Sequence, residues 1–462
     1  MAADPYQKAV RDTAKFLRRP VLQYFYDQFN PAKKTVILLP GGAGSALFRA
    51  DKEFDRVSSP SEYGFDSVWL TPGIFLGDGN KLPISKNGRD LLQRVIVPDG
   101  DIQYFVKAYV KAMRFFRANC NALLLGWDWR RDVMLAVEMV NDMIGDIKRK
   151  KGQQVLKNIF LVGHSMGGMV AKLFFSVHGD SAREIGGMIS VGTPFYGYIG
   201  QLRRIYEGED ILKDIYTAKS VAEIYSTFGG LYSLFQIDYA TFIRDKGKLG
   251  LANYPVTEPK GGHADAYQKS TSPPYPHWVR PNELPPALSL RHTLAERLPD
   301  DLRQKVFHIR ALMHETPVAA EWNQNLPDPY EPPRSRSPIK VGPEHLGKGD
   351  EVIPYWSARL ASTEDENVRD FTSGTGEHMT LMAQDYVLRH VLELVSGAPV
   401  LTKEEFIAEY GPNPQVATRE ELKAFMADAL PKIRLLSPKS LREIETLVPE
   451  RYLWRMLQEV AL

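Results

Sequence analysis

Cysteine is almost absent from this sequence of 462 residues, since Cys120 is the only one. No intrachain disulfide can form, as is usual for proteins of a reducing compartment. Runs of about 18 or more apolar residues are missing too, so no transmembrane helix is expected. The first residues lack the apolar segment of a secretory signal peptide. We therefore expect a cytoplasmic protein, with peripheral membrane association left open.

The sequence also has little net charge and no pattern of metal ligands. Its formal charge of +2 argues against a nucleic-acid binder, and zinc-finger and RNA-recognition signatures are missing. The motif H-E-x-x-H is absent, and the acidic residues at 364–366 lack the ligand spacing of a calcium loop. We expect no nucleic-acid partner, no metal and no cofactor.

One stretch near the middle of the chain has the pattern of a catalytic serine turn. Residues 159–162 form a short apolar run typical of a buried strand, and residues 163–167 read Gly-His-Ser-Met-Gly. Apolar residues at helical spacing follow as far as Val177. A strand, a tight G-x-S-x-G turn and a helix are the context of a nucleophile elbow. Ser165 would project from this turn, and the backbone N–H of Met166 would stabilise an oxyanion.

Strands and helices alternate on both sides of this turn. Apolar runs predict further strands at 35–39, 122–125, 188–194, 306–312 and 367–371, and helical periodicity predicts helices at 101–119 and about 131–150. A Gly-rich loop at 40–45 follows the first strand, and we assign the second oxyanion donor to the backbone N–H of Gly42. The alternation predicts an α/β-hydrolase fold with a doubly wound, mostly parallel sheet.

The alternation stops between residues 198 and 300, where short helical pieces such as 220–235 precede an irregular, aromatic and proline-rich stretch. An insertion after a strand lies over the site, so we expect a cap. Residues 46–100, which include Trp69, are expected to be rich in loops. The predicted organisation is a helical segment at 1–34, a hydrolase core at 35–197 and 301–399, the cap at 198–300, and a C-terminal helical extension at 400–462.

Both ends of the chain look helical. Residues 6–29 form a basic amphipathic pattern that could lie on a membrane surface, although packing on the protein's own domain is the favoured interpretation. Three capping boxes mark helix starts in the extension: Thr402 with Glu405, Thr418 with Glu421, and Ser440 with Glu443. Its apolar residues need a surface to bury against, so we expect the extension to serve packing or assembly.

A serine hydroxyl needs a base to take its proton and a carboxylate to orient that base. In this fold both follow late strands, with the acid before the histidine. His378 fits, because it follows the strand predicted at 367–371 through a Gly-rich loop. Asp350 is the best acid, in the Gly-bounded loop 347–354, with the adjacent Glu351 expected to point to the opposite side. Asp128 is an alternative only if that turn is mis-assigned.

With these residues in place, the sequence resembles the lecithin:cholesterol acyltransferase-like branch of the α/β-hydrolases, which includes phospholipases A and phospholipid:diacylglycerol acyltransferases. Six blocks between about 35 and 390 carry the resemblance in order: Val36 to Ser45, Gly126 to Arg130, Gly163 to Gly168, Gly192 to Phe195, Gly349 to Pro354, and Glu377 to Met379. The resemblance implies a triad of Ser165, Asp350 and His378. The sequence departs from the family pattern at Val352, where the family usually has threonine.

The resemblance also implies oxyanion donors at Gly42 and Met166 and an acyl site supported by the block from Trp127 to Arg130. We expect Trp127, Trp69 and Phe195 to contact the substrate. The predicted function is serine-dependent hydrolysis of lipid-like esters, with a lipid or other apolar ester as substrate. Two alternatives are an acyltransferase that uses an alcohol such as a sterol or diacylglycerol, and a non-catalytic hydrolase-like binding module.

Overall fold

The computed structural model of the protein describes residues 24–42, 44–50, 66–69, 95–99, 108–207, 225–258, 261–269, 279–322, 339–374, 376–397, 401–433 and 448–461. Most of the helix predicted at 6–29 and the capping box of Ser440 and Glu443 lie outside the described residues.

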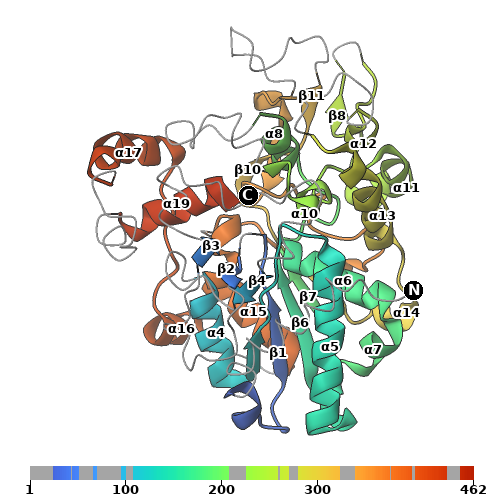
Figure 1. Ribbon diagram of the computed structural model, residues 1–462, viewed down its shortest axis with the longest axis vertical. Coiled ribbons are helices and arrows are strands. Elements are labelled where there is room, and N and C mark those ends of the chain that lie inside the picture. Colours follow the sequence, from blue (N-terminus) through green and yellow to red (C-terminus); the bar gives the residue numbers. More distant parts are fainter. Residues whose placement is uncertain are drawn as a thin grey trace.

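A six-stranded sheet forms the centre of the molecule (Figure 1). Its strands are β1 (Thr35–Leu39), β5 (Asn121–Leu124), β6 (Ile159–His164), β7 (Gly187–Val191), β9 (Val306–Ala311) and β14 (Val368–Phe371). Their order is β14-β9-β7-β6-β1-β5, and neighbouring strands are parallel. The predicted α/β fold with a doubly wound parallel sheet is confirmed.

Helices cover both faces of this sheet, which explains why its central strands are apolar throughout. All residues of β1 and β6 are buried. Helices α5 (Val133–Lys151) and α6 (Met166–Val177) pack on each other, while α4 (Ala108–Asn119), α15 (Asp385–Ser396) and α16 (Lys403–Tyr410) lie together on the other side (Figure 1). A strand buried on both faces has no polar side to show in its sequence.

The strand order reverses between β1 and β6. From β1 the chain moves outward to β5, then returns to β6 on the other side of β1 and continues through β7, β9 and β14. In open parallel sheets, ligands bind outside the carboxyl ends of the strands where the order reverses. The loops after β1 and β6 hold Gly42 and Ser165, the residues that the sequence singled out.

The described part of residues 198–300 lies over the carboxyl ends of the strands (Figure 1). It contains α8 (Ile199–Glu207), α10 (Gly229–Tyr232), α11 (Tyr239–Leu249), α12 (Ala266–Lys269) and α13 (Leu284–Ala295). A small sheet joins β8 (Val256–Thr257) in this segment to β11 (Ala320–Trp322) and β12 (Ile339–Lys340). We call these helices and this small sheet the upper layer. It includes residues on both sides of position 300.

One buried arginine ties this upper layer to the central sheet. Arg291 in α13 donates to the backbone carbonyls of Phe195, Ser233 and Phe235. Phe195 belongs to the loop after β7, whereas the other two carbonyls belong to the segment after α10. A single, fully buried guanidinium thus satisfies carbonyls from two segments and joins them.

The loop-rich prediction for residues 46–100 is wrong at three short segments. Strands β2 (Ala46–Ala50), β3 (Asp66–Trp69) and β4 (Val95–Asp99) form an antiparallel sheet with β2 in the middle. Each strand has only four or five residues, and β4 pairs with a segment about fifty residues away. Runs this short carry too little local pattern to be separated from loop sequence.

The C-terminal extension is helical where it is described, with α16, α17 (Arg419–Ile433) and α19 (Glu450–Ala461). The capping box at α16 is confirmed, since Glu405 N–H donates to Thr402 Oγ1 at 3.2 Å and Thr402 N–H donates to the Glu405 carboxylate at 2.8 Å. The same pair of bonds joins Thr418 and Glu421. Helix α19 packs against the 3-10 turn η9 (His378–Ala383).

Candidate active site

Ser165 occupies the turn between β6 and α6 with a strained backbone. Its φ is 52° and its ψ is −127°, a conformation that non-glycine residues rarely adopt. The Ser165 N–H donates to the Val191 carbonyl at 2.9 Å, and the Ser165 carbonyl accepts from Gly168 N–H at 3.0 Å. Strain of this kind is kept where the surroundings enforce it, and it is typical of functional sites.

The two glycines of the pentad are required by the contact between strand and helix. A Cβ atom at Gly163 would lie 2.4 Å from the backbone nitrogen of Gly168. At Gly167 it would lie 2.1 Å from the carbonyl oxygen of Leu39. Both distances are far below van der Waals contact with backbone atoms that cannot move aside. The pentad therefore satisfies the geometry of an elbow.

Gly42 lies against Met166, next to Ser165. A Cβ at Gly42 would be 2.9 Å from Met166 Sδ, and one at Gly41 would be 2.7 Å from Ser165 Cβ. Met166 is the first residue of α6, where a backbone N–H has no partner within the helix. Gly41 N–H is committed to the Tyr109 hydroxyl at 2.9 Å. Gly42 therefore stays the predicted donor beside Met166.

Asp350 directly follows β13 (Leu346–Gly349), which pairs antiparallel with β10 (His314–Pro317). Its Oδ1 accepts the backbone N–H groups of Val352 at 3.2 Å and Ile353 at 2.7 Å. Its Oδ2 lies 2.7 Å from His378 Nδ1, and the His378 N–H donates to the Asp350 carbonyl at 3.0 Å. Because Val352 contributes its backbone, this turn does not need a threonine side chain there.

The pairing with Asp350 fixes the tautomer of His378. A carboxylate only accepts, so Nδ1 carries the proton and the lone pair of the neutral ring is on Nε2. His378 is fully buried, and Nε2 has no hydrogen-bond partner among the described residues. Buried polar atoms are almost always paired, so a lone one calls for an explanation. The base predicted at His378 requires an Nε2 in this state.

Gly192, directly after β7, connects the serine to the acid and the base. A Cβ at Gly192 would lie 2.9 Å from Asp350 Oδ2 and 3.3 Å from His378 Nδ1, while the preceding Val191 is bonded to Ser165. His164, which directly precedes Ser165, also bonds His378. The structure thus places the three residues predicted for the triad in one buried region. Asp128, the alternative acid, is elsewhere and paired with arginine.

His164, inside the pentad, joins two sides of this region. Its Nε2 lies 2.9 Å from the carbonyl of His378, and its Nδ1 lies 2.7 Å from the Tyr109 hydroxyl. Burial, together with the nearby His378, lowers the pKa of His164 to about 3, so the ring is neutral near pH 7. Nε2–H must donate to the carbonyl, so Nδ1 accepts from Tyr109. The Tyr109 oxygen then accepts Gly41 N–H.

The sequence did not single out Tyr109, which sits in the first turns of α4. It lies in an ordinary helical pattern, and its role depends on a partner 55 residues away. No local signal marks it. His164 was visible as part of the pentad, but its two contacts were not.

The residues expected to contact substrate are placed differently from one another. Trp127 is buried with its indole N–H donating to the Pro40 carbonyl at 2.9 Å, so it braces the loop that carries Gly42. Phe195 is buried against the His308 ring at 4.9 Å between centroids. Trp69 ends β3, and its side chain lies outside the described residues.

Asp128 and Arg130 form a buried ion pair in the block after β5. Two bonds of 2.9 and 2.8 Å join the guanidinium to the carboxylate. Burial raises the pKa of Asp128, but the paired Arg130 outweighs this and holds it below its ordinary value. The pair fixes the turn between Trp127 and Trp129, and Trp129 packs edge-on against Phe228 of the upper layer at 5.5 Å.

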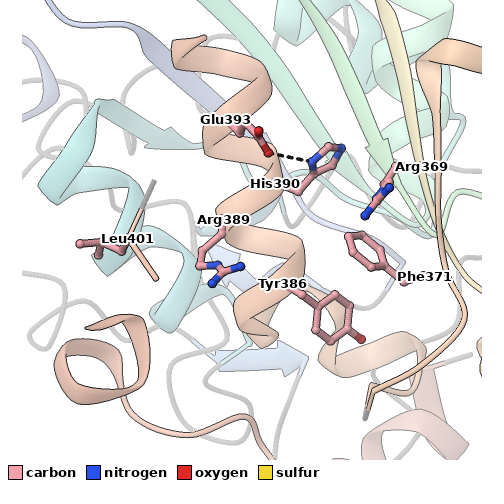
Figure 2. A pocket seen from close by; sticks show the side chains of 7 residues that line it. All are labelled: Arg369, Phe371, Tyr386, Arg389, His390, Glu393 and Leu401. Atoms are coloured by element: carbon pink, nitrogen blue, oxygen red, sulfur yellow. Dashed lines mark hydrogen bonds and ion pairs between the residues drawn. The ribbon is translucent and has the colours of Figure 1, made fainter. Parts of the chain in front are cut away.

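The triad region is enclosed. Ser165 is 2 % exposed and His378 is 0 % exposed, so the chain covers both reacting groups. A pocket of about 310 Å³ lies elsewhere, between β14 and α15. In Figure 2, Arg369 lies beside Phe371 while Arg389 points away toward Leu401. The guanidinium groups of these two arginines do not converge. No triad residue lines this pocket, whose lining residues are Arg369, Phe371, Tyr386, Arg389, His390, Glu393 and Leu401.

The described residues show neither a metal site nor a membrane-spanning helix. No three side chains of His, Cys, Asp or Glu there come together in a way that could bind a metal ion. Within that same part of the chain, every helix is too short or too polar to cross a membrane.

The sheet, the elbow and the upper layer define the class of the protein as an α/β-hydrolase fold. Residues 30–204 match the PGAP1-like alpha/beta domain, an α/β-hydrolase-type family. The match supports the hydrolase-type expectation and does not single out the lecithin:cholesterol acyltransferase-like branch, which stays a prediction.

The uncharacterized protein YJR098C of Saccharomyces cerevisiae is 27 % identical over 287 residues, which cover 58 % of this chain and 39 % of that protein. The chain thus spans about two fifths of the length of this relative. Among solved structures, the Tle4-Tli4 complex shows 14 % identity and a TM-score of 0.49 over 80 % of this chain and all of that one. The lipase BlEst2 of Bacillus licheniformis, in mature form, shows 11 % identity and a TM-score of 0.33 over 79 % and 93 %.

Proposed function

We propose that the protein hydrolyses lipid-like carboxylic esters through an acyl-enzyme on Ser165. One observation carries the proposal: the buried His378–Asp350 pair, linked to the elbow through Gly192 and His164, leaves Nε2 of the histidine without a partner among the described residues. A histidine held in this tautomer can take a proton only at Nε2. We assign the donor of that proton to Ser165, whose N–H bonds Val191 directly before Gly192, the residue that lies against Asp350 and His378.

The chemistry follows from these positions. Ser165 Oγ attacks the acyl carbonyl while its proton moves to His378 Nε2, and Asp350 stabilises the resulting imidazolium through Nδ1–H. The tetrahedral oxyanion accepts hydrogen bonds from the backbone N–H groups of Gly42 and Met166. Nε2–H then protonates the leaving alcohol, and an acyl-serine remains. Water, deprotonated by the same nitrogen, releases the carboxylic acid and restores the serine.

The apolar side chains of the upper layer, which lies over the site, support an apolar substrate. Phe228, Leu231 and Phe235 of the upper layer are buried, and Phe228 packs on Trp129 next to the block after β5. When such a layer opens, it exposes apolar surface suited to an acyl chain. Peripheral contact with a membrane would bring a substrate of this kind to the site and belongs to the proposal.

A second function, transfer of the acyl group to an alcohol, is favoured by the enclosure of the triad. Ser165 and His378 are both covered, and a site that excludes water slows hydrolysis of the acyl-enzyme. The same serine chemistry then serves an alcohol that binds in place of water.

Labelling with a fluorophosphonate probe tests the serine mechanism, with Ser165→Ala as the matched negative. We expect the wild-type protein to be labelled and the variant to be unlabelled at an unchanged melting temperature. A p-nitrophenyl ester series of increasing chain length, run with and without diacylglycerol or sterol, then separates hydrolysis from transfer. A folded wild-type protein that is never labelled would contradict both functions and favour a non-catalytic binding module.

A further inference from the structure

Helix α19, near the C-terminus, contacts the turn that carries the candidate base. It packs against η9, whose first residue is His378. The sequence predicted packing or assembly for this extension. The contact raises the question of whether one of its side chains acts on the triad.

Arg455 of α19 is the side chain that reaches the acid turn. It is 6 % exposed, and its Nη1 and Nη2 lie 2.6 and 3.3 Å from the two carboxylate oxygens of Glu351. Its Nε donates to the Ala417 carbonyl at 2.6 Å. A guanidinium bound by both oxygens of one carboxylate and by a backbone carbonyl has a fixed direction.

Glu351 directly follows Asp350 and has an unusual backbone. Its φ is 75°, and Ser165 is the other non-glycine residue with a positive φ in the described part of the chain. Its N–H donates to Thr316 Oγ1 at 2.9 Å. Because the chain reverses at Glu351, the N–H groups of Val352 and Ile353 turn back toward Asp350 Oδ1. The strained residue therefore shapes the turn that orients the acid.

The environment of Glu351 extends to the base. His314 Nδ1 lies 3.9 Å from Glu351 Oε1. Glu377, which precedes His378, has its pKa raised by burial and by Glu351, while His314 and Arg455 act in the opposite direction. Arg455 is thus a buried positive charge near two carboxylates, one next to Asp350 and one next to His378.

We propose that Arg455 is a positioning residue, which holds Glu351 in its left-handed conformation and so keeps Asp350 aimed at His378. Helix α19 is then part of the catalytic apparatus, and its release from η9 lowers activity without removing any triad residue. This inference rests on the proposed serine mechanism and deepens it by assigning a control element to the same site.

The same helix offers a matched control. Arg451, one turn earlier, also pairs with a glutamate, since its Nη1 lies 3.3 Å from Glu421 Oε1. Both partners of this pair are about half exposed and far along the chain from the triad residues. Substituting either arginine removes one charge and one ion pair from α19. Of these two arginines, Arg455 is the one that contacts the residue after Asp350.

The experiment compares Arg455→Met, Arg455→Lys and Arg451→Met in the full chain. Readouts are the rate constant of fluorophosphonate labelling, the melting temperature and the far-downfield proton resonance of the His378–Asp350 hydrogen bond. We expect Arg455→Met to slow labelling by about tenfold to a hundredfold, as small misplacements of catalytic groups do. Arg455→Lys should fall in between, and Arg451→Met should stay within about twofold of wild type.

Substitutions at Glu351 separate positioning from general loss of stability. Glycine adopts a positive φ without strain, so Glu351→Gly should label faster than Glu351→Ala. Adding Arg455→Met to Glu351→Gly should cost less than it does in the wild-type background. Arg455→Lys retains the positive charge, and Glu351→Gly retains the turn. These two variants therefore test whether Arg455 positions Asp350 even if Arg455→Met fails to fold.

The outcomes distinguish this inference from the function on which it rests. If Arg455→Met labels at the rate of Arg451→Met and keeps the downfield resonance, Arg455 does not position the acid, while the serine mechanism stands. If the wild-type protein is not labelled, the proposed function fails. The resonance still reports on the His378–Asp350 bond in that case, and its persistence in Arg455→Met would overturn the inference.

Discussion

Hydrogen bonds of fixed direction run through the site from one loop to another. Gly41 N–H donates to Tyr109, Tyr109 donates to His164, and His164 donates to the carbonyl of His378. These three hydrogen bonds link the loop of Gly42 to the turn of His378 through His164, which directly precedes Ser165. Their direction depends on one neutral histidine and one tyrosine hydroxyl.

Tyr109→Phe should remove the link to Gly41 and slow turnover by about tenfold, less than the loss of an oxyanion donor itself. The control is Tyr254→Phe, because the Tyr254 hydroxyl also makes a buried bond, to the Ile237 carbonyl at 2.6 Å in the upper layer. Both variants should lose about 1–3 kcal/mol of unfolding free energy. Ester-hydrolysis rates that fall equally in the two would show that Tyr109 has no special role.

His164 should make the protein less stable in acid. Its pKa is about 3 in the folded state, against the ordinary 6.5, so between these values the unfolded chain binds a proton that the folded one does not. Stability therefore falls as pH drops below about 6.5, by about 2 kcal/mol at pH 5 from this group.

Urea unfolding at pH 7 and pH 5 measures this contribution. The change between the two pH values should be about 2 kcal/mol smaller in His164→Gln than in wild type. His178→Gln is the control, since His178 is partly exposed and pairs with Glu138 at 3.1 Å. An equal pH dependence in wild type and His164→Gln would mean that His164 is not buried as described.

At the scale of elements, the elbow holds strand and helix in contact closer than any side chain permits. Gly167→Ala should destabilise the protein by about 1–3 kcal/mol or more, because the new Cβ would overlap the Leu39 carbonyl. Gly145→Ala in α5 is the matched control. Its Cβ would meet only the end of Arg149 at 3.5 Å, so the helix should gain about 0.5–1 kcal/mol. Thermal unfolding of both variants measures these changes. An unchanged melting temperature in Gly167→Ala would show that strand and helix are not in such close contact at this residue.

At the scale of the whole molecule, the predictable parts are those with a local pattern. The strand over residues 35–39 was predicted with its observed bounds, because a strand buried on both faces is a continuous apolar run. The pentad and the loop of His378 were visible for similar reasons. What the sequence missed depends on distant partners: Arg455 meets Glu351 across 104 residues, and β2 pairs with β4 far along the chain.

The extension after residue 400 shows why such contacts escape prediction. Its caps and apolar residues identify helices, and Phe406 packs against Phe115 of α4 at 5.0 Å, as a packing role requires. Nothing in the sequence of α19 distinguishes Arg455 from Arg451, because the difference lies in what each faces after folding. The catalytic roles of Ser165, Asp350, His378, Gly42 and Met166 remain predictions until chemistry is measured.

The most direct test of the account is the mass of the intact protein during turnover. Rapid acid quench of a reaction with a p-nitrophenyl ester, followed by mass spectrometry, should show one acyl group per chain and peptide mapping should place it on Ser165. The Ser165→Ala variant should carry none. Ester hydrolysis that proceeds without an adduct in the wild type, or at an undiminished rate in Ser165→Ala, would contradict the serine mechanism.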